Sequence, residues 1–159
     1  MADEKDLKLA KETFATLCRM LENAQWKFQK DEEELKVKCG AQGDDLPIEL
    51  SINVDAERML VVVASMLPMA IQEDKRLDVA IAVTAINNVL ANGSFDYDVL
   101  SGRIFFRMVN SFRDSVLGEE LFAYMVYASC QIVDEYNDKL LMLAKGMLSM
   151  EQFLADINS

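Results

Sequence analysis

The sequence predicts a single α+β domain in which an antiparallel sheet carries a layer of helices. Its 159 residues are the usual size of one domain, and no Pro- or Ser-rich linker divides them. Segments with a two-residue apolar period come in runs, and segments with a helical period separate these runs. The order is one helix, four strands, one helix, two strands, one helix and a final short helix. This order is typical of helices packed on an antiparallel sheet.

The first quarter of the chain reads as a helix followed by a strand hairpin. Apolar residues recur with helical spacing from Leu7 to Leu21. Trp26 and Phe28 then alternate with polar neighbours, and the alternation resumes after the acidic run 31–34. That run lacks the alternating ligands and the glycine of a calcium loop, so we interpret it as a solvated turn.

The next two strands are predicted from a change of pattern. Residues 46–54 alternate between apolar and polar side chains, which indicates a half-buried strand. Residues 55–58 have the length of a hairpin loop. Residues 60–64 are apolar throughout, which favours a central strand covered on both faces and closed by Pro68. An aspartate in place of Val62 is therefore expected to unfold the domain.

A second helix and a second hairpin follow. The helix is expected from about 73 to 92, where Asn92 and Gly93 supply a left-handed end. Residues 95–99 and 104–108 alternate on either side of a turn, which predicts the hairpin. One stripe of the helix holds Leu77, Ala80, Ile81, Thr84, Ala85 and Asn88.

The last long helix is expected to begin at Glu119 and Glu120 and to break near Gly146. Ser149 and Gln152 then have the spacing of a capping box for a short terminal helix. The apolar stripe of the long helix is broad, and one sheet face does not account for its width. The residues that widen it are Leu121, Ala128, Leu141 and Leu148.

The composition argues against several classes of protein. The 27 acidic and 16 basic residues leave a net charge of −11, so nucleic acid and anionic membranes are poor partners. Without histidine there is no Ser-His-Asp or Cys-His triad and no His-ligated metal site. No phosphate-binding loop occurs. We therefore expect that the protein is not an enzyme and that it binds neither a metal nor a cofactor. One alternative stays open: a carboxylate-based hydrolase in which Asp96 and Asp98 meet a third acid.

The cysteines and the apolar stretches bear on the compartment. Cys18, Cys39 and Cys130 stand far apart and on the apolar sides of their segments, as buried reduced thiols do. The N-terminus is acidic and lacks the apolar core of a secretory signal. The longest apolar stretch, 59–71, is well short of the roughly 20 residues that span a bilayer. We expect a cytoplasmic protein.

The surplus of apolar residues points to binding of another protein. Ten methionines occur, and methionine is frequent on surfaces that accept varied partners. The hypothesis is a homodimeric, chaperone-like or regulatory module that holds a segment of a basic or neutral partner, and Leu141→Glu tests the dimer. The alternative is a regulatory domain that senses a small molecule in an enclosed pocket of Met and Phe. The candidate protein-binding residues are Trp26, Phe28, Phe105, Leu141 and Leu148.

Several features of residues 67–107 occur together in a known family. They are a strand end near Pro68, a helix ending in Asn87 and Asn88, Gly-x-Phe at Gly93–Phe95, and Gly-x-Ile-x-x-Arg at Gly102, Ile104 and Arg107. With their flanking segments they resemble the YbjN family of bacterial proteins over about residues 25–145. The resemblance implies one domain over 1–159, with a type III secretion chaperone-like fold of a twisted antiparallel sheet and three helices, typically dimeric. That family is catalogued under sensory transduction regulators, and it implies no catalytic residue.

Overall fold

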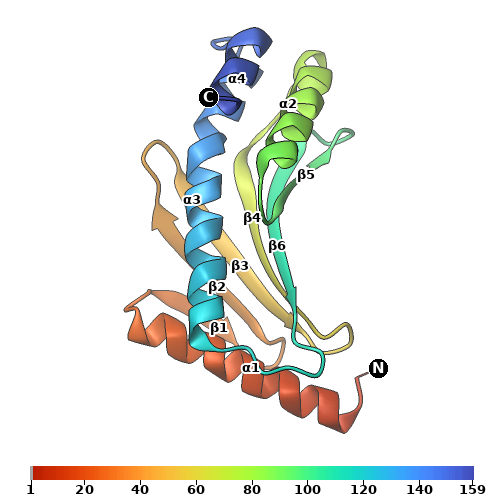
Figure 1. Ribbon diagram of the computed structural model, residues 1–159, viewed down its shortest axis with the longest axis vertical. Coiled ribbons are helices and arrows are strands. Elements are labelled where there is room, and N and C mark those ends of the chain that lie inside the picture. Colours follow the sequence, from red (N-terminus) through yellow and green to blue (C-terminus); the bar gives the residue numbers. More distant parts are fainter. Residues whose placement is uncertain (1) are drawn as a thin grey trace.

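The computed structural model describes residues 2–159 as a six-stranded antiparallel sheet with four α-helices (Figure 1). The strands lie in the order β1-β2-β3-β4-β6-β5. This arrangement confirms the predicted α+β fold class. The elements are α1 (Glu4–Asn23), β1 (Phe28–Asp31), β2 (Lys36–Gln42), β3 (Pro47–Asp55), β4 (Leu60–Ala70), the 3-10 turn η1 (Glu73–Lys75), α2 (Arg76–Val89), β5 (Ser94–Asp98), β6 (Arg103–Ser111), α3 (Glu119–Ala144) and α4 (Met150–Ile157).

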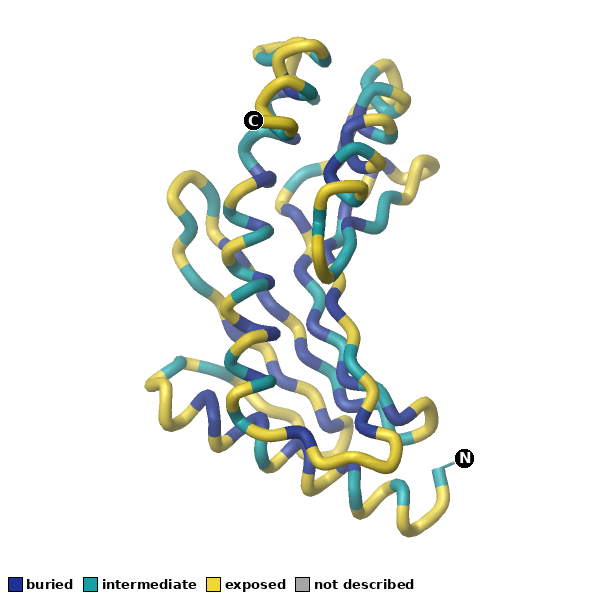
Figure 2. The backbone as a smooth tube through the Cα atoms, viewed as in Figure 1, coloured by how far each residue is buried: buried dark blue, intermediate teal, exposed yellow. Residues whose placement is uncertain are grey.

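The helices cover one face of the sheet, and the other face stays open. α3 runs along β4 and β6, and α1 crosses the end of α3 (Figure 1). Burial alternates along the strands accordingly (Figure 2). In β3, Leu50 and Ile52 are at most 2 % exposed beneath the helices, whereas Glu49 and Ser51 face solvent on the opposite side. The core therefore lies between the sheet and the helix layer.

Three of the four hairpins have the same type of turn. Each turn begins with an aspartate whose Oδ1 accepts a hydrogen bond from the backbone N–H two residues later. Each turn ends, four residues after the aspartate, with a residue at a positive φ of 50–73°. The pairs of first and last residues are Asp31 and Leu35, Asp55 and Met59, and Asp98 and Gly102.

The space around the last turn position decides which residue stands there. Leu35 and Met59 are 6 % and 2 % exposed, so burial of their side chains offsets a left-handed strain of about 1–2 kcal/mol. At Gly102 a Cβ atom would lie 2.3 Å from the carbonyl oxygen of Ile71. The same two residues are joined by a 2.8 Å hydrogen bond from the Ile71 N–H to the Gly102 carbonyl. This turn therefore requires glycine.

β4 continues past Pro68, where the sequence predicted its end. Its register against β6 shifts between Met66 and Ala70, around the proline. Irregular pairing of this kind tolerates proline because no regular ladder bond needs the missing N–H. β4 thereby extends to Ala70, beyond the predicted end.

The prediction that residues 60–64 are covered on both faces is wrong. Val61 and Val63 are fully buried beneath the helices, but Val62 and Ala64 are half-exposed on the open face. Helices of residues 2–159 cover only one side of this strand. The position at which an aspartate would be buried is therefore Val63 and not Val62.

α2 is shorter than predicted, since η1 precedes it and it ends at Val89. Gly93 does have a left-handed φ of 75°, but it lies in the loop before β5 and not at the helix end. Inside the helix, Asn87 faces the outer edge of β5. Its Nδ2 donates to the carbonyl of Phe95 (2.9 Å), and its Oδ1 accepts from the N–H of Phe95 (2.8 Å). One side chain thus makes both hydrogen bonds that a neighbouring strand would make there.

The short terminal helix packs against α2 and α3. The predicted capping box is present, with Ser149 and Gln152 bonded reciprocally. Phe153 of α4 is fully buried. The sheet, α1, α2 and α4 all contact α3. The apolar stripe of α3 is broad largely because it packs against all of these elements within one copy of the protein.

Candidate protein-binding surfaces

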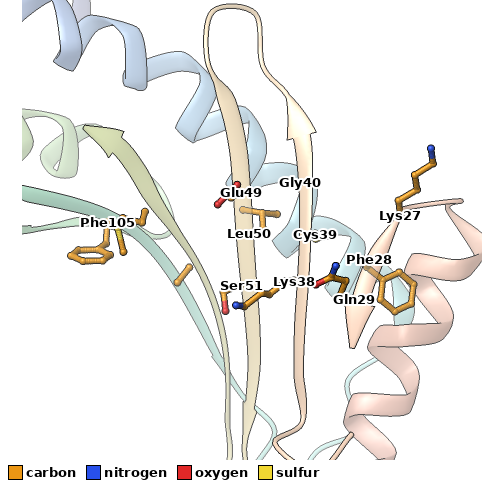
Figure 3. A pocket seen from close by; sticks show the side chains of 12 residues that line it. Lys27, Phe28, Gln29, Lys38, Cys39, Gly40, Glu49, Leu50, Ser51 and Phe105 are labelled. Atoms are coloured by element: carbon orange, nitrogen blue, oxygen red, sulfur yellow. The ribbon is translucent and has the colours of Figure 1, made fainter. Parts of the chain in front are cut away.

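The open face of the sheet carries a groove of about 700 Å³ (Figure 3). The groove crosses the strands from β1 to β6. In Figure 3 the strands lie in front of α3, so the groove is on the side of the sheet away from that helix. Small residues form its middle, because Gly40, Ser51 and Ala64 stand on the adjacent strands β2, β3 and β4. The register places Ser51 directly beside Ala64.

The β6 end of the groove is apolar. Met66 of β4 is 49 % exposed and pairs in register with the half-buried Phe105 of β6. The guanidinium Nη1 of Arg103 lies 3.4 Å from the sulfur of Met66. Methionine, aromatic residues and arginine are the types enriched in protein interfaces. This end therefore has the composition of a contact surface for another protein.

Two cations line the groove, although the chain as a whole is acidic. Lys27 precedes β1, and the side chain of Lys38 extends from β2 toward Ser51 of β3 (Figure 3). Glu49 is the single acid among the lining residues. None of the ion pairs found among residues 2–159 involves either lysine or Arg103. The local charge of the groove thus differs in sign from the net charge of −11.

A second apolar surface lies on α2. Its six residues are the helix stripe noted in the sequence, and they bound a hollow of about 650 Å³. Leu77 is 76 % and Ile81 54 % exposed, so the stripe faces away from the core. The buried side of α2 is formed by Val79, Ala82, Val83 and Ile86. α2 therefore has two apolar sides, and only one of them packs inside the protein.

The five residues predicted to bind a partner lie at three separate places. Trp26 is on the helix side, where its ring contacts Tyr127 of α3 edge-on at 5.8 Å and its Nε1 donates to the Tyr127 hydroxyl. Phe28 is half-buried and lines the β1 end of the groove, and Phe105 lines the β6 end. Leu141 and Leu148 are half-buried near the end of α3, with Leu148 packed against the core. Only Phe28 and Phe105 share a site.

The sequence analysis missed most of the groove for a definite reason. Val62 and Ala64 project from the open face but belong to the uninterrupted apolar run 60–64, which a fully covered strand would also show. The exposure of these residues could have been inferred from the polar residues that face the same side on the neighbouring strands. Lys38 and Ser51 are polar at the positions that face the same side as Ala64.

The two aspartates considered for hydrolysis have structural partners. Asp96 forms a 2.8 Å ion pair with Arg107. Hydrogen bonds from Ser101 and from the Leu100 N–H hold the pKa of the Asp98 carboxyl below its usual value. Within residues 2–159 no three His, Cys, Asp or Glu side chains gather in a way that could hold a metal ion. The third acid that this alternative requires is not beside them.

The thiols have little nucleophilic character at neutral pH. Cys18 and Cys39 are buried as predicted, and Cys130 is half-buried. Burial raises the pKa of both Cys39 and Cys130 to about 11, so both thiols stay protonated. The groove of about 700 Å³ is open to solvent, unlike the enclosed Met and Phe pocket that a small-molecule sensor would need.

None of the helices within residues 2–159 is both long enough and apolar enough to span a membrane. Neither a protein-family model nor a curated protein matches the sequence. The fold is nevertheless similar to solved structures. YbjN from E. coli, described as a proposed transcription regulator, superposes with a TM-score of 0.59 at 16% identity, over 79% of this chain and 91% of YbjN.

A chain of the HopA1–SchA chaperone–effector complex superposes with a TM-score of 0.55 at 13% identity, over 87% of this chain and 99% of that one. Identities this low show a shared fold. The resemblance to YbjN stated from the sequence therefore holds at the level of the fold, and this protein has the α+β architecture that YbjN and a chain of the chaperone–effector complex also have.

Proposed function

We propose that this protein is a non-enzymatic, chaperone-like binding module that holds a segment of a partner protein on the open face of its sheet. The observation that carries the proposal is the groove, where Met66 and Phe105 present apolar surface that no helix of residues 2–159 covers. Contiguous apolar surface that remains after folding commonly marks a partner site. A chain of similar fold was solved in a chaperone–effector complex, which supports the proposal.

A photo-crosslinking amino acid at Ser51 tests the proposal in cells of the source organism. Ser51 is exposed in the middle of the groove, so a bound segment would lie within reach of the probe. Ala15 is the matched control, because it is exposed on α1 in the helix layer. We expect a discrete crosslinked polypeptide from Ser51 and none from Ala15.

The crosslinked polypeptide is then produced together with the protein. We expect a complex of fixed stoichiometry by light scattering, and we expect the partner to be less soluble when it is produced alone. Probes at Trp26 and Leu77 extend the test to the helix side of the sheet and to the α2 stripe. If no position yields a polypeptide, other than a second copy of this chain, that forms a stable complex, the proposed function is wrong.

We further propose that the protein is a homodimer that pairs through α2. The exposed stripe has no charged residue, and it carries large side chains at Leu77 and Ile81 next to small ones at Ala80, Thr84 and Ala85. Two copies of this helix packed across a two-fold axis would set the large residues of each against the small residues of the other. Such a surface is self-complementary.

Light scattering of the Ile81→Glu variant tests the dimer. We expect the unchanged protein to have about twice its chain mass of 18.0 kDa and the variant to have the mass of one chain. The thermal unfolding midpoint should barely change, because Ile81 is 54 % exposed. Leu141→Glu is the control on α3. A monomer produced by Leu141→Glu and not by Ile81→Glu would contradict pairing through α2.

We also propose that the protein is located in the cytoplasm. Its three free cysteines, whose thiols have raised pKa values, support this location. A reducing environment keeps such thiols free.

A further inference from the structure

We infer that the groove on the open face receives an amphipathic α-helix of the partner, with acidic side chains on either side of its apolar stripe. The inference rests on the proposed function, because it states which kind of segment the groove holds. It follows from the backbone groups of the sheet face, from the length of the groove and from its charge.

The face of a sheet selects a helix over an extended chain. The backbone N–H and C=O groups of β2, β3 and β4 are used in pairing with their neighbours on both sides. An extended segment laid across them would find no backbone partners, and buried unpaired backbone groups are costly. A helix satisfies its own backbone groups and presents only side chains. The small residues Gly40, Ser51 and Ala64 leave room for its apolar stripe.

The groove is long enough for about three and a half turns of helix. It crosses the five neighbouring strands from β1 to β6. At about 4.8 Å between strands, four spacings give roughly 19 Å. With a rise of about 1.5 Å per residue, a helix of roughly 13 residues spans that length.

The charges of the groove favour an acidic helix, because two cations, Lys27 and Lys38, and one acid, Glu49, are among the residues that line it. Both lysines are absent from the ion pairs found among residues 2–159. They are therefore available to acids of a partner. The net charge alone predicted basic or neutral partners, whereas the groove itself has the opposite preference.

Two designed peptides of about 18 residues, enough for roughly five turns, test the inference. Both carry the same leucines at positions i, i+3, i+4 and i+7, flanked by glutamates in one peptide and by lysines in the other. Binding of the fluorescein-labelled peptides to the full-length protein is measured by anisotropy at two salt concentrations. We expect the acidic peptide to bind at least about tenfold more tightly, with a preference that shrinks as salt rises.

Two substitutions separate charge from shape. Lys38→Glu should lower the affinity for the acidic peptide about tenfold and raise the affinity for the basic peptide. The gain for the basic peptide also shows that the variant is folded. Ala64→Arg fills the middle of the groove while adding a positive charge. It should weaken both peptides if a helix occupies that space, whereas charge attraction alone would strengthen the acidic one. Lys11→Glu, the same charge change on the exposed side of α1, should alter neither affinity.

The outcomes distinguish this inference from the proposed function. Equal affinity of the two peptides, or an acidic-peptide affinity that Lys38→Glu and Ala64→Arg leave unchanged, would overturn the acidic helix. If Ser51 then still crosslinks a partner that forms a stable complex, the proposed function stands and only the nature of the segment is wrong. If Ser51, Trp26 and Leu77 crosslink no polypeptide other than a second copy of this chain, the proposed function itself fails.

Discussion

Replacement of Val63 by aspartate is expected to unfold the protein. Val63 is fully buried in the middle of β4, where the register places Ile52 on one side and Met108 on the other. An unpaired buried charge costs several kcal/mol, against a total stability of roughly 5–15 kcal/mol for a domain. Circular dichroism and the fluorescence of Trp26, the single tryptophan, should show loss of the folded state at room temperature.

Val62→Asp is the matched control, with the same substitution one residue away on the opposite face. Val62 is half-exposed, so its aspartate remains hydrated and should cost less than about 2 kcal/mol. The pair therefore measures which face of β4 the helices cover. Two equally stable variants, or two unfolded ones, would contradict the open face described above.

Gly102→Ala is expected to have the second-largest effect. The residue has a φ of 73°, and its new Cβ atom would lie 2.3 Å from the carbonyl oxygen of Ile71. The left-handed conformation costs about 1–2 kcal/mol, and overpacking against fixed backbone costs a further 1–3 kcal/mol or so. Urea unfolding should show a loss of roughly 3 kcal/mol.

Gly146→Ala supplies the comparison that isolates the steric contact. Gly146 has nearly the same φ of 71°, but a Cβ atom added there would meet no atom within 4 Å outside its own surroundings in the chain. Its substitution by alanine should lower the stability only by the cost of the left-handed conformation, about 1–2 kcal/mol. If Gly102→Ala costs no more than Gly146→Ala, the Ile71 backbone moves aside and the turn does not require glycine.

The sequence predicted the elements well where one side of a segment is polar. β3 could be recognised because Glu49 and Ser51 interrupt its apolar residues at every second position. The capping box at Ser149 and Gln152 is a local signal, and it was found for that reason. A polar side chain at a regular interval reports directly on which side of an element meets water.

The binding surfaces were harder to predict because an exposed apolar residue looks like a core residue in a sequence. Val62 and Ala64 were assigned to a fully covered strand, although they line the open face. Leu77 and Ile81 were assigned to a helix stripe whose direction could not be known, since Val79 and its buried neighbours make the other side of α2 equally apolar. Which of two apolar sides packs inside depends on tertiary contacts, which the local pattern does not contain.

The carboxamide of Asn87 has a consequence for assembly of the sheet with other sheets. A fibre grows only when every added unit leaves an unpaired strand edge for the next one. At Phe95 the outer edge of β5 already has both backbone hydrogen bonds supplied by Asn87, and α2 lies against that strand. Within residues 2–159 the remaining outer edge is that of β1. Two copies joined through β1 would present only their β5 edges, each blocked at Phe95 by Asn87, so the blocked position opposes further addition of sheets.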